Sequence, residues 1–464
     1  MRSCAAPRKL CSLEKQGILK ASGIFMEYFF VFAATLSLVG ALTAVLQVRQ
    51  IGWAVWIWFG SGWINGELAL WLIGGQLGFV VLWVASVGVT TPAFAVGLSL
   101  LIAAWVLLAL ALRDGFDAGA AFSRALRSAL GADFVTQLST ARRIKLEQQI
   151  HSREWLWPFR FRRPGVRYVR NVAYSTAGKR GLLDVYLPVA QGKRRPVLLQ
   201  VHGGAWMMGH KSEQAQPLLH RMVEMGWVGV SINYRLAPRD AYPAQIIDVK
   251  KAIAWVKQHI QEYGGDPDFI VVTGGSAGGH LSLLAGLTPR HSDWQEGFEG
   301  VDTAVQGVLA LYPVVDLTNR HGIRQQDRMD GFITRRIIQQ TREAAPHVFE
   351  DGSPISWIRR DGVAEAAPPF CIVQGTHDSL VWVEEVRRFV AEFSSLATHP
   401  LVYAELPRAQ HAFEIFHSPR TSHFLNAAST WLEWVRAQSG QVTAPMEADA
   451  EENMNQADDE SDHN

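Results

Sequence analysis

A serine, an aspartate and a histidine each follow a short apolar run of the sequence, in an order that suits nucleophilic catalysis. Ser276 lies in Gly-Gly-Ser-Ala-Gly-Gly-His, Asp378 ends Gly-Thr-His-Asp, and His411 lies in Gln-His-Ala-Phe. In such a set the serine attacks a carbonyl, the histidine takes its proton, and the aspartate holds the imidazole in the correct tautomer. The pattern therefore predicts two-step acyl transfer through Ser276, as in ester hydrolysis.

The residues around Ser276 are small. A buried strand that turns sharply into a helix strains the turn residue, and only small neighbours such as Gly274, Ala277 and Gly278 leave room for that turn. The helix expected after residue 276 would aim its N-terminal amides at the same spot. Alone the motif is weak, because a chain with 40 glycines can contain it by chance and because a glycine-rich turn can serve only close helix packing. The other motifs have to decide.

A second glycine motif, His-Gly-Gly-Ala-Trp at 202–206, follows the apolar run 197–201. Its glycines let backbone amides converge on one point, as an oxyanion site requires, although a flexible turn is the plainer interpretation. Other side chains could replace the acid or the base. These alternatives are Asp316, His280, His377 and His417.

From Val166 onward, short β-branched runs alternate with helical patterns such as 244–263, which is typical of an α/β domain with a mostly parallel sheet and helices on both faces. We predict a catalytic domain over residues 166–437. The eight expected strands are 166–174, 183–187, 197–201, 228–232, 269–273, 307–312, 370–374 and 401–405. In such sheets ligands bind at the carboxyl ends of the strands, where all the motifs lie.

Residues 28–112 contain only two charged side chains, Arg49 and Glu67, and we expect this region to cross a membrane. Three spans are expected at 28–46, 68–89 and 93–112. The segment 51–64, rich in tryptophan, is either an interfacial helix or a fourth span.

Basic residues flank both ends of this region, which places both flanks in the cytoplasm if the number of spans is even. If translation starts at Met26, three spans also fit a cytoplasmic catalytic domain. We therefore predict an integral protein of the bacterial inner membrane with a cytoplasmic catalytic domain. The flanking residues are Arg2, Arg8, Lys9, Lys15 and Lys20 before, and Arg113, Arg124, Arg127, Arg142 and Arg143 after.

The remaining segments are an N-terminal tail over 1–27, an amphipathic linker or cap over 113–165, and an acidic tail over 438–464 that we expect to be disordered. Basic and acidic residues number 44 and 43, which gives no reason to expect a nucleic-acid partner. The three cysteines cannot form a disulfide framework, and no metal-binding motif is present. We expect neither a metal nor a cofactor.

Together the motifs resemble those of the hormone-sensitive-lipase-like carboxylesterases of the α/β-hydrolase superfamily, over residues 166–436. The matching segments also include Asn-Tyr-Arg-Leu-Ala-Pro at 233–238, followed by Asp248, which with Arg235 we interpret as structural. Some membrane-attached bacterial esterases look similar along their whole length. The resemblance implies an eight-stranded α/β-hydrolase fold and a serine esterase or lipase acting on a small-molecule or lipid ester.

By the same resemblance, the oxyanion would be held by the amides of Gly204, Ala205 and Ala277, with Gly203 as an alternative donor. The chain departs from the family at Gly275, where relatives often carry aspartate, and at Ala205, where they often carry glycine. An amidase or peptidase with the same triad, and a membrane scaffold without catalysis, are the two rival functions.

Overall fold

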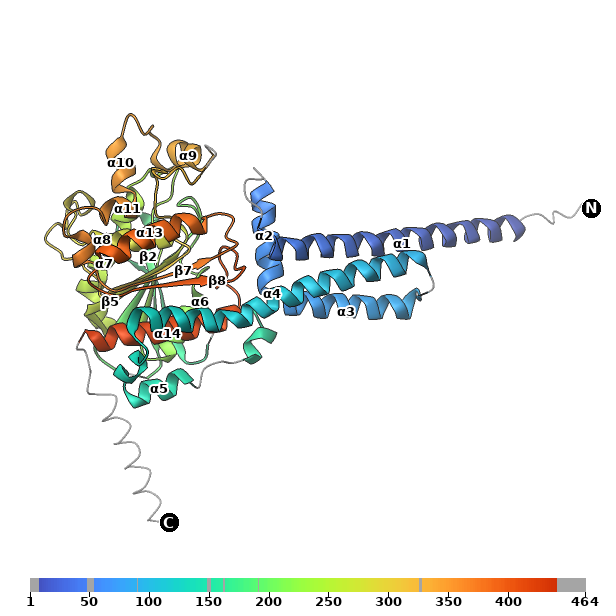
Figure 1. The fold of residues 1–464 in the computed structure, drawn as a ribbon, viewed down its shortest axis with the longest axis horizontal. Coiled ribbons are helices and arrows are strands. Elements are labelled where there is room, and N and C mark those ends of the chain that lie inside the picture. The colour runs from blue at the N-terminus through green and yellow to red at the C-terminus, as the bar shows by residue number, and fades with distance from the viewer. Residues whose placement is uncertain are drawn as a thin grey trace, which may run out of the picture.

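The computed structural model describes residues 8–47, 54–89, 91–147, 152–161, 163–190, 192–324 and 328–439. Residues 1–7 of the N-terminal tail and 440–464 of the acidic tail lie outside the described residues, and so do Arg49 and Trp53 of the apolar region. Figure 1 shows an α/β domain from which a bundle of long helices projects.

Eight strands form the sheet: β1 (Val166–Ala173), β2 (Leu182–Pro188), β3 (Arg195–Val201), β4 (Val228–Ile232), β5 (Gly265–Gly275), β6 (Gly307–Leu311), β7 (Phe370–Gly375) and β8 (Leu401–Leu406). Their order is β1-β2-β4-β3-β5-β6-β7-β8. The β1–β2 and β2–β4 pairs are antiparallel, and the other pairs are parallel. Strands that are buried on both faces consist of continuous apolar runs, and β4 to β7 could therefore be predicted from the sequence.

The helices of the α/β domain after β3 are α6 (Gln216–Glu224), α7 (Ala244–His259), α8 (Ala277–Leu287), α9 (Arg328–Phe332), α10 (Pro346–Asp351), α11 (Pro354–Trp357), α12 (Val363–Ala366), α13 (Val383–Leu396) and α14 (Pro419–Gln438). Short helical turns are η2 (Phe134–Gln137), η3 (Ser152–Leu156), η4 (Gly178–Gly181), η5 (Ile260–Tyr263), η6 (Ser292–Trp294) and η7 (Ile333–Ile338). Helices α7, α8 and α13 pack on one face of the sheet, and α6 and α14 pack on the other.

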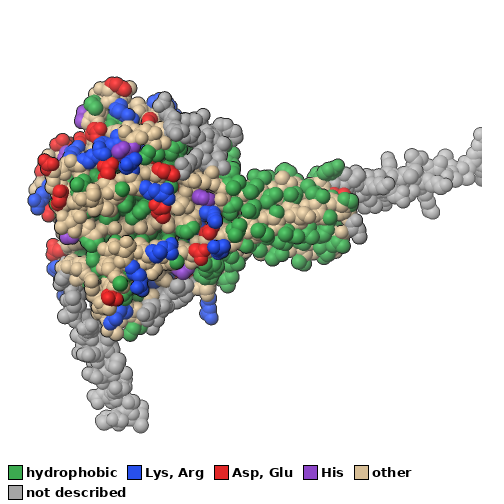
Figure 2. Space-filling model, in the orientation of Figure 1, with side chains coloured by type: hydrophobic (Ala, Val, Ile, Leu, Met, Phe, Trp, Pro, Cys, Tyr) green, Lys and Arg blue, Asp and Glu red, His purple; other side chains and the backbone are tan. Residues whose placement is uncertain are grey.

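The N-terminal helices are α1 (Arg8–Val45), α2 (Val55–Glu67), α3 (Ala69–Ser86), α4 (Pro92–Leu130) and α5 (Thr140–Glu147). Among the described residues, three stretches are long and apolar enough to cross a membrane: Phe25–Val45, Ala69–Ser86 and Pro92–Leu130. Figure 2 shows an apolar surface over this bundle where it leaves the α/β domain. The tryptophan-rich α2, with 13 residues, is not one of the three.

Helix α4 does not end where its apolar run ends. The whole helix has 39 residues and no break. Its second half lies beside α14 against the sheet (Figure 1). Ala118, Phe122 and Leu126 are buried there, in the same core as residues of β6, β7 and β8. The amphipathic pattern after residue 113 therefore belongs largely to a helix of the α/β core, and η2, α5 and η3 follow as short separate helical pieces among the described residues before β1.

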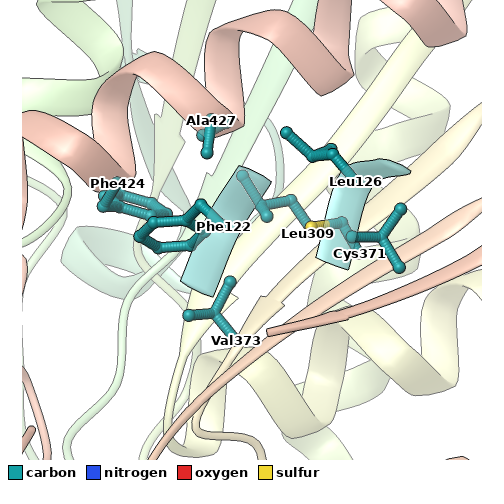
Figure 3. Close-up of a pocket in the computed structure, with 9 residues that line it drawn as sticks. Phe122, Leu126, Leu309, Cys371, Val373, Phe424 and Ala427 are labelled. Carbon is teal, nitrogen blue, oxygen red and sulfur yellow. The ribbon is translucent and has the colours of Figure 1, made fainter. Parts of the chain in front are cut away.

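Figure 3 shows a small void at this junction, lined by Phe122, Leu126, Leu309, Cys371, Val373 and Phe424, among others. Its volume is about 10 Å³, which is no more than one water molecule needs. All the labelled side chains are apolar or, for Cys371, a thiol. We interpret the void as a packing defect between α4, α14 and the sheet, on the face opposite α8.

Candidate active site

Ser276 occupies the turn between β5 and α8 with φ 57° and ψ −123°, a conformation that costs energy for any residue with a Cβ atom. Its backbone is held by hydrogen bonds from its own amide to Leu311 O and from the His280 amide to its carbonyl, both 2.9 Å. The small neighbours are required: a Cβ at Gly278 would lie 2.1 Å from Val201 O. Ser276 is thus partly exposed at the carboxyl end of β5.

The loop after β3 lies directly beside this turn, because a Cβ at Gly203 would lie 3.2 Å from the Cβ of Ser276. Gly204 and Ala205 both have positive φ, 112° and 51°. Within the described part of the chain, the amides of Gly204, Ala205 and Ala277 donate to no protein acceptor. Three unused donors near one hydroxyl are an arrangement that suits a developing anion.

Gly203 differs from these three residues. Its amide donates to Oε1 of Gln214 at 2.6 Å, and its carbonyl accepts from Nδ1 of His202 at 2.7 Å. An amide that is already hydrogen-bonded cannot also bind an oxyanion without losing that partner. The amide of Gly203, the alternative oxyanion donor expected from the sequence, is therefore already bound to Gln214 in this conformation.

Asp378 and His411 meet across the ends of β7 and β8. Nδ1 of His411 donates to Oδ2 of Asp378 at 2.7 Å, and both side chains are almost fully buried. The other carboxylate oxygen of Asp378 accepts from the amides of Leu380 and Val381 at 2.9 and 2.8 Å. Gln410 secures the second loop, since its Oε1 accepts from the amides of Ser379 and His411. The carboxylate is thus fixed and aimed at the ring.

Two residues of the site were not identified from the sequence, Tyr312 and Glu414. The ring of Tyr312, at the end of β6, lies 4.3 Å from the ring of His411. Its hydroxyl donates to the carboxyl group of Glu414 at 2.5 and 2.6 Å. The same hydroxyl lies where a side chain at residue 275 would begin, because a Cβ at Gly275 would be 2.5 Å from it. Tyr312 therefore links the Ser276 turn to the His411 loop.

The alternatives to Asp378 and His411 have other partners. Asp316 accepts from the amides of Thr318 and Arg320 at 2.7 and 2.8 Å, which folds its own loop. His280 bridges Nε1 of Trp206 and the carbonyl of Gly352, and burial lowers its pKa to about 4.

Two further sets of polar groups singled out in the sequence have partners of their own. Nδ1 of His417 lies 3.2 Å from Oε2 of Glu154. Arg235 and Asp248 form an ion pair of 2.8 Å, as expected. In the described part of the chain, no three His, Cys, Asp or Glu side chains converge to hold a metal ion.

The chain is similar to known esterases. The family model described as BD-FAE matches residues 183–393. A probable carboxylic ester hydrolase of Mycobacterium tuberculosis, LipM, is 39% identical over 415 residues, covering 87% of this chain and 92% of the relative. Esterase LipC of the same organism is 38% identical, covering 61% of this chain and 72% of the relative.

Among solved structures, esterase B from Lactobacillus rhamnosis superposes with a TM-score of 0.50 at 19% identity, covering 69% of this chain and 98% of that one. That similarity supports the fold. Similarity to LipM extends over most of both chains. The chain therefore belongs to the hormone-sensitive-lipase-like carboxylesterases of the α/β-hydrolase superfamily, and it is a carboxylic ester hydrolase.

Proposed function

We propose that this ester hydrolase works through an acyl-enzyme on Ser276, with His411 as general base and acid and Asp378 as its orienting carboxylate. The observation that carries the proposal is the buried hydrogen bond of 2.7 Å between His411 and Asp378, at the same edge of the sheet as the strained Ser276 turn. The uncommitted amides beside Ser276 support it.

The reaction proceeds in two halves. Oγ of Ser276 attacks the carbonyl carbon while its proton passes to Nε2 of His411, and the amides of Gly204, Ala205 and Ala277 hold the oxyanion. The carbon–oxygen bond to the alcohol then breaks as His411 returns the proton to the leaving oxygen. In the second half, water gives a proton to His411 and attacks the acyl-enzyme, and the acid leaves as Ser276 recovers its proton.

We also infer that α1, α3 and the first half of α4 cross a membrane. This rests on the length and apolar composition of the three candidate spans. It also rests on their exposed apolar side chains, such as Phe32, Val81 and Val106, each more than half exposed in the protein alone. Such surfaces would be unfavourable in water and are ordinary in lipid.

The replacement Ser276→Ala tests the mechanism. In the purified full-length chain we expect hydrolysis of p-nitrophenyl butyrate to fall by at least about 10⁴-fold, because nucleophile removal costs this much or more in serine hydrolases. Labelling by a fluorophosphonate should disappear while the thermal midpoint stays within a few degrees.

Ser282→Ala is the matched control, since Ser282 lies on α8 and its hydroxyl donates only within the helix, to Gly278 O at 2.8 Å. It should keep both labelling and turnover. Wild-type rates in Ser276→Ala would refute the mechanism. A matched anilide substrate separates the rival amidase, which would cleave ester and amide at comparable rates.

A further inference from the structure

Helix α2 joins two of the candidate spans without being one itself. At about 1.5 Å per residue it is roughly 20 Å long, too short for a hydrocarbon core of about 30 Å. Figure 1 shows it running across the ends of α1 and α3, on the side where the α/β domain lies. It is therefore placed between the apolar bundle and the candidate active site.

Aromatic side chains of α2 reach the loop that carries His411. Nε1 of Trp63 donates to the carbonyl of Ala412 at 2.8 Å, and its ring stacks on Phe416 with centroids 4.4 Å apart. The ring of Phe59 meets the ring of His411 edge to face, with centroids 6.0 Å apart and planes at 78°. The ring of His411 thus lies close to both Tyr312 and Phe59 of the N-terminal region.

Further contacts fasten this region to both catalytic loops. Nε2 of Gln47, just after α1, donates to the carbonyl of Thr376 at 2.9 Å, near Asp378. At the end of α2, Glu67 is buried and paired with Arg420, and it accepts from Oγ of Ser418 at 2.7 Å. These polar contacts fix the position of α2. Its packing against the catalytic loops is therefore more than contact between two apolar surfaces.

The chemistry of the site gives α2 a role toward the substrate. Because His411 returns its proton to the departing alcohol, the alcohol part of the ester lies on the His411 side of the site. That side is walled by Phe59, Trp63 and Phe416. From there Trp56 and Ile57 continue the apolar wall outward along α2, and they are 59% and 62% exposed.

We propose that α2 forms the membrane-side wall of the active site and that the substrate is a bilayer lipid ester, whose alcohol part lies against this wall. The inference rests on the proposed acyl-enzyme function and on the membrane placement of the three spans. Apart from the buried Glu67, α2 carries no charged side chain, so the route suits an uncharged lipid such as an acylglycerol. The acyl group is cleaved from the lipid without the lipid leaving the bilayer first.

The full-length chain, reconstituted in phosphatidylcholine vesicles, provides the test. Two rates are measured on each preparation: hydrolysis of dioleoylglycerol in the bilayer and hydrolysis of p-nitrophenyl acetate from solution. The double replacement Trp56→Gln, Ile57→Gln should lower the ratio of the first rate to the second by about tenfold, because apolar contact with the lipid is lost. Phe116→Ala is the control, since Phe116 is exposed on α4 and contacts Trp155 instead of the His411 loop.

The outcomes are distinct. An unchanged ratio in the double variant, or a wild-type protein that cleaves only the soluble ester, overturns the role of α2 while leaving the mechanism intact. Failure of the wild-type chain to cleave either ester, together with absence of fluorophosphonate labelling, refutes the proposed function itself. A ratio that falls equally in Phe116→Ala would indicate general damage to the bundle and would also overturn the inference.

Discussion

Glu414 is a fully buried carboxyl group beside the proposed catalytic base. Burial raises its pKa to about 6 from an ordinary value of 4.5, although the hydroxyl of Tyr312 donates to it. Because the folded chain binds this proton more tightly than the unfolded chain, the contribution to stability is complete below pH 4.5 and is lost as the pH rises through 6. The difference amounts to about 2 kcal/mol.

Glu414→Gln should remove this dependence. Between pH 4.5 and 7.5, the wild-type chain should lose about 2 kcal/mol of unfolding free energy relative to the variant, as measured by denaturation in detergent at the two pH values. Glu365→Gln, at an exposed residue of α12, serves as the control and should follow the wild type. Parallel pH curves for wild type and Glu414→Gln would contradict the prediction.

The same pair explains why residue 275 departs from the family pattern. An aspartate there would place its Cβ 2.5 Å from the Tyr312 hydroxyl and its carboxylate near that of Glu414. Two carboxylates in one buried site repel each other. Gly275 thus leaves room for the Tyr312 hydroxyl and keeps a second carboxylate away from Glu414.

At the scale of elements, α4 and α14 approach closely through glycine. A Cβ at Gly119 would lie 2.7 Å from Nδ1 of His423, whereas the adjacent Ala120 is exposed. Gly119→Val should therefore destabilise the α/β domain by about 1–3 kcal/mol through overpacking, seen as a lower thermal midpoint. Ala120→Val should leave the midpoint nearly unchanged, and an equal loss in both variants would show that the helix and not the contact was affected.

Some elements of the site could be predicted from the sequence and others could not. The strands before Ser276, Asp378 and His411 were predictable because buried parallel strands are apolar runs, and turn glycines mark their ends. The Tyr312–Glu414 contact was not, because it joins positions 102 residues apart and neither side chain belongs to a local pattern. A tyrosine directly after β6 and an acid in an otherwise apolar His411 loop were the available signals.

Helix α4 was misjudged for a related reason. Its apolar half has the composition of a membrane span, and its amphipathic half resembles a linker when no partner is visible. Only the tertiary structure shows that Phe122 and Leu126 complete the core above the sheet. Likewise, the tryptophans of α2 suggested an interfacial helix or a fourth span, and they gave no sign that Phe59 would touch His411.

At the scale of the whole molecule, the three proposed spans would put the start of α1 and the α/β domain on opposite sides of the membrane. The end of α1 and the start of α3 lie next to the α/β domain. The α/β domain and α2 are therefore at the same end of the helical bundle (Figure 1). Arg113, Arg124 and Arg127 follow the last span on that side, and Arg160 and Arg163 lie nearby in the sequence. By the positive-inside tendency these residues favour a cytoplasmic α/β domain, whereas Arg8, Lys9, Lys15 and Lys20 before the first span favour the opposite orientation. We keep the cytoplasmic placement as the prediction to be tested.

Reporter fusions after residue 439 test that orientation. A green fluorescent protein fused there should fluoresce, and an alkaline phosphatase fused there should be inactive, because the first folds in the cytoplasm and the second needs an oxidising compartment. The reverse pattern would place the α/β domain outside the cytoplasm. Fusions after residue 89, between α3 and α4, should give the opposite result to those after residue 439 and so provide the internal control.

The unbroken course of α4 has a mechanical consequence. In the proposed membrane placement, a single helix of 39 residues, about 58 Å long, enters the bilayer at one end and is part of the hydrolase core at the other. With no hinge between anchor and catalyst, the height and tilt of the reaction centre above the lipid surface are set by the fold itself. Such an enzyme would search for its substrate by lateral diffusion in two dimensions, and inserting a flexible tether into α4 would uncouple the two halves.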